Sequence, residues 1–177
     1  MRRREFIALM GASVTWPFAA MAQQPGRTYR LGGLSAVPPN SPQLVAMFEE
    51  LRRLGFIEGQ NLIIDWRQYA LHIERIPELA TELVKSKVDV IYVSGDAGIR
   101  AAQKATKTIP ILAITDDMLG EGLVNSLARP NGNTTGLSIL ASELDGKRQE
   151  LIIEAVPGLH RMGALADTNV TPVAKLK

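Results

Sequence analysis

Short apolar runs alternate with amphipathic segments along most of this chain. Residues 88–94 (VDVIYVS) and 109–115 (IPILAIT) are almost entirely apolar, a pattern typical of strands covered on both faces of a parallel sheet. Other segments that are bounded by turn residues predict further strands. We expect five strands in the region before residue 141, at residues 29–35, 61–68, 88–94, 109–115 and 134–140.

Capping and turn residues mark helices between these strands. Ser41 is a predicted N-cap, Pro42 stands at the first helical position, and Gly55 ends this first helix. Its apolar residues fall on one helical stripe, as expected for a helix with one buried face: Leu44, Val45, Phe48, Leu51 and Leu54. We expect helices at residues 42–54, 76–87, 96–106, 119–127 and 144–156.

This alternation predicts an α/β fold with a doubly wound parallel sheet, because strands joined by helices pair in parallel through right-handed crossovers. We assign residues 23–140 to one complete lobe. The helix at 144–156 and a further strand at 161–167 cannot bury both faces alone, so we interpret residues 141–177 as a hinge and the incomplete start of a second α/β lobe. The last residues, TPVAKLK, are expected to form the opening turn of a helix. This arrangement exposes apolar side chains such as Leu151, Ile152 and Val156.

Residues 1–22 have the pattern of a secretory signal peptide. Three arginines at positions 2–4 precede an apolar stretch at 6–20, and Ala20-Met21-Ala22 is a small-x-small cleavage site. We expect export to the periplasm, cleavage after Ala22, and no stable membrane insertion of the remaining chain. The order RREFI resembles the twin-arginine signal, although Sec export stays open. An N-terminal amphipathic helix is the alternative.

Net charge argues against a nucleic-acid partner. The chain of 177 residues has 20 Lys+Arg and 18 Asp+Glu, a formal charge of +2. The predicted signal peptide contains three of the basic residues and one of the acidic residues, so the remainder carries 17 of each and has no basic excess. The chain has no Cys, which excludes disulfides, thiolate metal sites and thiol nucleophiles.

Known enzyme motifs are also missing. The sequence contains no G-x-G-x-x-G turn, no Walker A sequence and no G-x-S-x-G elbow. His72 and His160 lie far apart in the sequence, which gives a histidine metal site little support. We therefore expect no cofactor, no metal and no catalytic residues, and an enzyme on this fold is the least favoured interpretation.

Loops at the carboxyl ends of the strands are where an open α/β sheet binds ligands. Three such loops lie at residues 35–37, 94–98 and 115–118. Backbone N–H groups at the start of the helix after residue 95 favour a carboxylate, and Asp96, Asp116 or Asp117 can accept hydrogen bonds from an ammonium group. Such a site suits an amino acid or a similar small polar solute. Asp96 is equally consistent with a simple helix cap.

Several segments resemble the periplasmic substrate-binding proteins of ABC transporters related to tryptophan- and tyrosine-type binding components. They cover nearly the whole chain up to Asp167. The segments are the RREF signal with its WPFAAMAQQ end, residues 48–67 (FEELRRLGFIEGQNLIIDWR), 76–91 (IPELATELVKSKVDVI), 101–111 (AAQKATKTIPI), 122–136 (GLVNSLARPNGNTTG) and 143–158 (ELDGKRQELIIEAVPG).

The resemblance implies two α/β lobes that close on a small solute, with an ABC transporter permease as partner. The ligand contacts that it implies in the first lobe are Ser35, Ser94, Gly95, Asp96, Ala97, Thr115 and Asp117. Two departures bear on which solute is bound. The family commonly has Gly-Thr-Pro where this chain has Gly95-Asp96-Ala97, and Asp-Pro where it has Asp117-Met118.

Family members are longer than this chain, so the resemblance also implies a C-terminally truncated receptor. A receptor cleft needs two walls, and we expect this chain to bind its solute weakly or not at all. The alternative is a stand-alone periplasmic lobe with a sensory or protein-interaction role.

Overall fold

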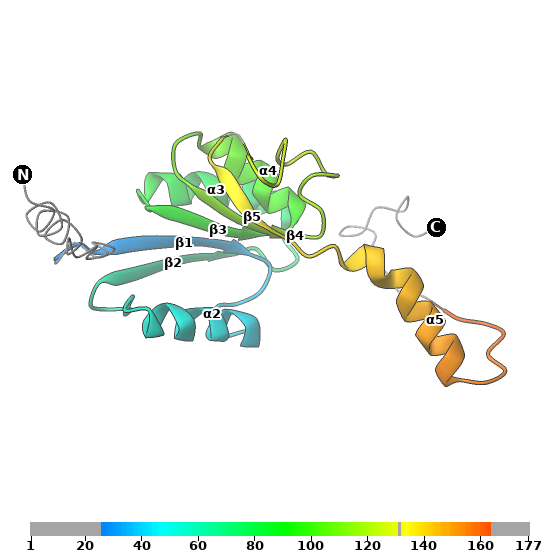
Figure 1. Ribbon diagram of the computed structural model, residues 1–177. Helices are drawn as coiled ribbons and strands as arrows, with labels where there is room; N and C mark the ends of the chain where they lie inside the picture. Colours follow the sequence, from blue (N-terminus) through cyan, green and yellow to red (C-terminus); the bar gives the residue numbers. More distant parts are fainter. Residues whose placement is uncertain (1–25, 131, 164–177) are drawn as a thin grey trace, which may run out of the picture.

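One parallel sheet forms the centre of the computed structural model, which describes residues 26–130 and 132–163 (Figure 1). Its strands are β1 (Tyr29–Ser35), β2 (Leu62–Gln68), β3 (Val90–Ser94), β4 (Ile111–Thr115) and β5 (Thr134–Ser138). The helices in the described part of the chain are α2 (Pro42–Arg53), α3 (Ile76–Lys85), α4 (Asp96–Ala105) and α5 (Asp145–Ala155), with short 3-10 turns η1 (Ile73–Arg75) and η2 (Ala141–Leu144).

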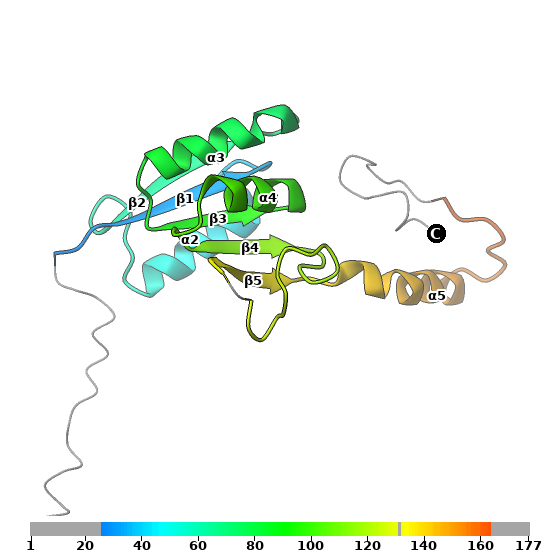
Figure 2. The ribbon, with the colours of Figure 1, turned by 90° about the horizontal axis from the view of Figure 1, so that it is seen from above.

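The strands lie in the order β2-β1-β3-β4-β5, and all neighbouring pairs are parallel. Helix α2 lies on one face of the sheet, and α3 and α4 lie on the other (Figures 1 and 2). The expected α/β fold with a doubly wound sheet is therefore confirmed. The strand order changes direction between β1 and β3, and this switch point is where such sheets bind ligands.

The face under α3 and α4 holds the larger core cluster. Alternate residues of the central strands point into it because successive side chains of a strand face opposite sides, and Leu34, Ile91 and Ile111 are fully buried there. Helix α4 approaches closely at Gly98, where an added Cβ would lie 2.8 Å from Val93 Cγ2. A glycine at this position lets the helix pack directly on β3.

The face under α2 is built around Trp66. The Trp66 ring stacks on Tyr92 at 5.8 Å and meets Phe48 of α2 edge-on, also at 5.8 Å. It lies over Gly33, where an added Cβ would collide with the indole ring. This aromatic cluster covers β1, β2 and β3, so Trp66 is a packing residue of this face.

The same face is less covered over β4 and β5. Leu112 and Leu137 are 40% and 63% exposed, and Leu137 pairs with the half-buried Ile114 in the parallel ladder. Helix α5 projects away from the sheet (Figure 1) and has no buried residue. Its apolar side chains Leu151 and Ile152 are 52% and 45% exposed, as the sequence predicted.

The helix predicted at residues 119–127 is wrong, because turns and bends occupy this segment. The carboxylate of Asp117 accepts hydrogen bonds from the N–H groups of Leu119 (3.1 Å) and Gly120 (2.8 Å). This local bonding competes with helix formation. Gly122 then adopts a φ of +63°, a left-handed conformation that a right-handed helix does not contain.

Smaller differences concern caps and the chain ends. Ser41 has the extended backbone of an N-cap, but its hydroxyl makes no capping hydrogen bond and its Oγ is buried without a partner in the described structure. Gly95 is the N-cap of α4, so Asp96 is its first helical residue and not its cap. Residues 161–163 form no strand. The rest of the predicted strand at 161–167, the predicted signal peptide and the predicted C-terminal helical turn lie outside the described residues.

Candidate functional site

The carboxyl ends of β1, β3 and β4 meet at one edge of the sheet, and most of the predicted ligand-binding residues lie there. Ser35 ends β1, Ser94 ends β3 and Thr115 ends β4. Because β1 pairs with β3 and β3 pairs with β4, the loops after these strands are neighbours. The structure thus brings together residues that are up to 80 positions apart in the sequence.

Ser35 and Ser94 form the pair at the switch point between β1 and β3. Their Oγ atoms are 3.2 Å apart, within hydrogen-bond distance. Ser35 is 1% exposed, and its Oγ also accepts a hydrogen bond from the N–H of Val37 at 3.2 Å. Ser94 is half-buried, so it is the more accessible hydroxyl of the two.

Asp96 and Thr115 form a second pair, which joins the loops after β3 and β4. The Thr115 hydroxyl donates a hydrogen bond to Oδ1 of Asp96. Thr115 is buried and Asp96 is half-buried, whereas Gly95 and Ala97 on either side are exposed. Asp96 lies in the first turn of α4, where the helix dipole stabilises a negative charge.

The two carboxylates that follow β4 diverge, as expected for adjacent residues at the end of a strand. Asp117 caps the turn at Leu119 and Gly120. Asp116 Oδ1 accepts a hydrogen bond from the N–H of Ala141 at 2.6 Å. Both side chains therefore hold loop backbone in this conformation, and Asp117 is not brought into contact with the Ser35–Ser94 pair by any described hydrogen bond.

Tyr69 also belongs to this edge of the sheet, although it was not among the predicted ligand-binding residues. It is 9% exposed, and its hydroxyl donates to the carbonyl of Ser94 at 3.4 Å. Burial raises the pKa of the Tyr69 hydroxyl, while a backbone hydrogen bond at Ala36 opposes this rise. A polar hydroxyl one position beyond a predicted strand was the only sequence signal for this role.

Ser138 at the end of β5 was also missed. Its Oγ accepts a hydrogen bond from the N–H of Met118 at 3.0 Å. The chain after β5 is tied to the β4 loop as well, because the N–H of Ile139 donates to the carbonyl of Thr115 at 2.9 Å. The segment that leads from β5 to α5 therefore starts beside the candidate site.

The chemistry at this edge consists of hydroxyls, backbone N–H groups and carboxylates. These groups can hold a small polar molecule by hydrogen bonds. In the described part of the chain, no three His, Cys, Asp or Glu residues are grouped so that they could hold a metal ion. His72 lies outside the site, at an exposed position beside Glu74.

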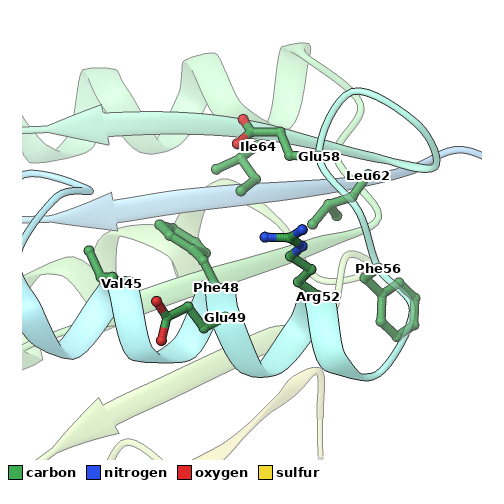
Figure 3. Close-up of a pocket in the computed structure, with 8 residues that line it drawn as sticks. All are labelled: Val45, Phe48, Glu49, Arg52, Phe56, Glu58, Leu62 and Ile64. Atoms are coloured by element: carbon green, nitrogen blue, oxygen red, sulfur yellow. The ribbon is translucent and has the colours of Figure 1, made fainter.

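Two surface hollows lie away from the hydroxyl pairs. One, of about 230 Å³, lies between α2 and β2, where Phe48, Ile64 and the Arg52 side chain surround it (Figure 3). The other, of about 460 Å³, lies between α3 and α4 and includes Ala97 and Arg100. Neither of these two hollows contains the Ser35–Ser94 or Asp96–Thr115 pair.

Comparison with known proteins shows which family this sequence matches. A family model described as ABC transporter substrate binding protein matches residues 44–176. A tyrosine-binding protein of Clostridioides difficile (strain R20291) is 34% identical over 117 residues, which are 65% of this chain and 33% of that protein. The chain thus spans about one third of the length of this curated relative.

Solved structures show the same fold. A conserved domain protein from Vibrio cholerae O1 biovar eltor str. N16961 is 30% identical with a TM-score of 0.66, over 75% of this chain and 45% of that one. An ABC domain from Streptococcus pneumonia, solved in complex with L-Trp, is 24% identical with a TM-score of 0.56, over 63% of this chain and 38% of that one. The similarity to the L-Trp complex supports only the fold, which is of the periplasmic-binding-protein type.

Proposed function

We propose, because the chain belongs to the family of ABC transporter substrate binding proteins, that it serves as the solute-binding component of an ABC importer. The observation that carries this proposal is the convergence of the loops after β1, β3 and β4 at the switch point of the sheet. A site of this kind binds small solutes and has no need of catalytic groups. The family is one of binding proteins, and we propose no enzymatic activity.

The solute is an amino acid in this proposal. The first N–H groups of α4, such as that of the exposed residue Ala97, can donate to a carboxylate, while Asp96 can accept from an ammonium group. A curated relative binds tyrosine and a relative in fold binds L-Trp. Aromatic amino acids are therefore the first solutes to test. The proposed contacts of this lobe are Ser35, Ser94, Gly95, Asp96, Ala97, Thr115 and Asp117.

The remaining parts of the proposal concern the whole receptor. Residues 23–140 form the first lobe, and residues 141–177 form the hinge and the start of a second lobe that closes over the solute. Residues 1–22 direct export to the periplasm, where the loaded receptor meets its permease. None of the helices in the described ranges is both long and apolar enough to span a membrane.

Isothermal titration calorimetry of the purified gene product, expressed at its full length, tests this function. L-tyrosine and L-tryptophan are the ligands, and succinate is the control because it has carboxylates but no ammonium. We expect a receptor with both lobes to show saturable binding of at least one amino acid and none of succinate, and residues 23–177 alone to bind weakly or not at all. Absence of binding for all twenty amino acids overturns the proposed solute class.

The alternative is a stand-alone lobe with a sensory or protein-interaction role. It is favoured by the apolar side chains that α5 exposes, including Ile153 at 53% and Val156 at 49%. Exposed apolar patches mark surfaces that associate with other proteins. Analytical ultracentrifugation separates the two functions, since a solute receptor is expected to stay monomeric with and without its amino acid.

A further inference from the structure

We infer that Tyr69 is a positioning residue that holds the loop after β1 and the loop after β3 at a fixed spacing, and so sets the affinity of the site. This inference rests on the proposed function. Tyr69 directly follows a third strand, β2, which ends at Gln68, and is not among the proposed solute contacts. It would act on the solute only through Ser35 and Ser94.

The contacts of Tyr69 reach both serines. Its backbone N–H donates to the carbonyl of Ser35 at 3.1 Å, which extends the β1–β2 ladder one step past its last strand pair. Its side-chain hydroxyl donates to the carbonyl of Ser94 at 3.4 Å. One residue thus fixes the carbonyls of both residues whose hydroxyls face each other at 3.2 Å.

Packing fixes the Tyr69 ring in this position. The ring belongs to the core cluster under α3 and α4, together with Leu34 and Ile99. Only its polar end reaches the site, where it lies beneath Gly95: a Cβ added to that glycine would be 3.8 Å from the Tyr69 hydroxyl oxygen. A buried hydroxyl needs hydrogen-bond partners, so moving the β3 loop away would deprive the Tyr69 hydroxyl of its acceptor, the Ser94 carbonyl.

The alternative is that Tyr69 only fills space in the core. Tyr92 allows this alternative to be tested, because it is equally buried, at 7% exposure against 9% for Tyr69. Tyr92 lies on the opposite face of the sheet, stacked on Trp66, and contacts neither serine loop through a described hydrogen bond. Tyr92→Phe is therefore a matched control for Tyr69→Phe.

Two backbone amides report on the spacing of the loops without any ligand. The N–H of Val37 donates to Ser35 Oγ at 3.2 Å, and the N–H of Gly95 donates to the carbonyl of Ile114 at 2.9 Å. Hydrogen exchange of such amides measures local opening. The hydrogen-exchange rates of these two amides, measured by NMR on the full-length gene product, therefore test the positioning role directly.

The experiment compares wild type, Tyr69→Phe and Tyr92→Phe by amide exchange and by calorimetry with L-tyrosine and L-tryptophan. Tyr69→Phe is expected to speed exchange at both reporter amides and to weaken binding, each by roughly three- to ten-fold, the effect of one neutral hydrogen bond. Tyr92→Phe is expected to change neither. Melting temperatures of both variants show whether a general loss of stability accounts for the result.

Each outcome has a distinct meaning. Unchanged exchange at Val37 and Gly95 in Tyr69→Phe overturns the inference, whatever the ligand result. Equal changes in both tyrosine variants also overturn it, because they indicate a general core effect. If exchange rises only in Tyr69→Phe while wild type binds no amino acid, the positioning role stands and the proposed function fails.

Discussion

The hydroxyl of Thr115 donates a hydrogen bond to the carboxylate of Asp96, and this bond connects the ends of two neighbouring strands. It places a negative charge beside the exposed backbone that begins α4. The resemblance to the family implies a neutral threonine at this position. We therefore expect this chain to favour a positive group of its solute at the start of α4.

Asp96→Asn tests this charge preference. The asparagine oxygen can still accept from Thr115, but the negative charge is gone. Tyramine, which has an ammonium and no carboxylate, is expected to bind the variant about ten-fold more weakly than it binds wild type, which is the loss of one charge-assisted hydrogen bond.

Binding of 3-(4-hydroxyphenyl)propionate, which has only the carboxylate, should stay the same or improve in Asp96→Asn. Competition calorimetry against L-tyrosine measures both ligands. An equal loss for the two ligands would show that the substitution disturbs the loop and not the charge preference.

Asp117 has a structural and a proposed binding role, and two variants separate them. Asp117→Ala removes the acceptor for the N–H groups of Leu119 and Gly120, so we expect the free energy of unfolding to fall by about 1 kcal/mol. Asp117→Asn keeps an acceptor and should leave stability nearly unchanged. Urea titration measures both effects.

The proposed contact of Asp117 with the solute predicts weaker binding of L-tyrosine by Asp117→Asn at unchanged stability. If the Asn variant binds as wild type does, the Asp117 carboxylate is a turn cap and makes no contribution to solute binding.

Gly33 is required where the Trp66 ring covers β1. Gly33→Ala introduces a methyl group that collides with the indole, and we expect the free energy of unfolding to fall by about 1–3 kcal/mol, the usual cost of overpacking. Denaturation in urea is the measurement. Gly146→Ala in α5 is the control, because nothing lies within 4 Å of its added Cβ, and a similar loss there would contradict the packing explanation.

Asp89 predicts a pH dependence of stability. The Arg30 backbone N–H donates to this carboxylate at 2.7 Å and Arg27 pairs with it at 2.8 Å. The hydrogen bond from Arg30 is the main cause that lowers the pKa of Asp89 below its ordinary value of 3.8, and Arg27 adds to it. Because the folded-state pKa is depressed, the carboxylate stabilises the fold above the ordinary value, and this contribution is lost as the pH falls through the folded-state pKa.

Asp89→Asn is therefore expected to lower the free energy of unfolding by about 1 kcal/mol near neutral pH. The effect is small because solvent screens the charge of this partly exposed carboxylate. The difference from wild type should be the same at about pH 5 and smaller at about pH 3. Urea titrations at these values measure it, and a difference that grows in acid would contradict the assigned cause.

The sequence predicted those parts of the fold that depend on local pattern. The apolar runs of β3 and β4 identified buried strands, and the stripe with Leu44 identified the inner side of α2. Val45 and Leu54 of the same stripe are 39% and 53% exposed, because α2 rests on the sheet through a narrower face. Helical spacing alone does not show how wide the covered face is.

The parts that were missed depend on contacts between distant residues or on competition within a loop. Residues 119–127 have apolar residues at helical spacing, but Asp117 binds the backbone that would begin the helix. Tyr69 reaches Ser94, 25 positions away, and nothing in the sequence near Tyr69 indicates that contact. The candidate site was predictable as a set of loops, because parallel strands place their carboxyl ends together, but its hydrogen-bond pairs were not.

The strand order also determines when the sheet is completed during synthesis. The first strand made, β1, lies between β2 and β3, and β3 begins only at Val90. When the ribosome has released the chain up to Gln68, β1 has one of its two neighbours and an open hydrogen-bonding edge, which invites pairing with other chains. A nascent chain of this length is therefore a natural client for a chaperone, and the open edge passes from β1 to β3, β4 and then β5 as each strand emerges and pairs.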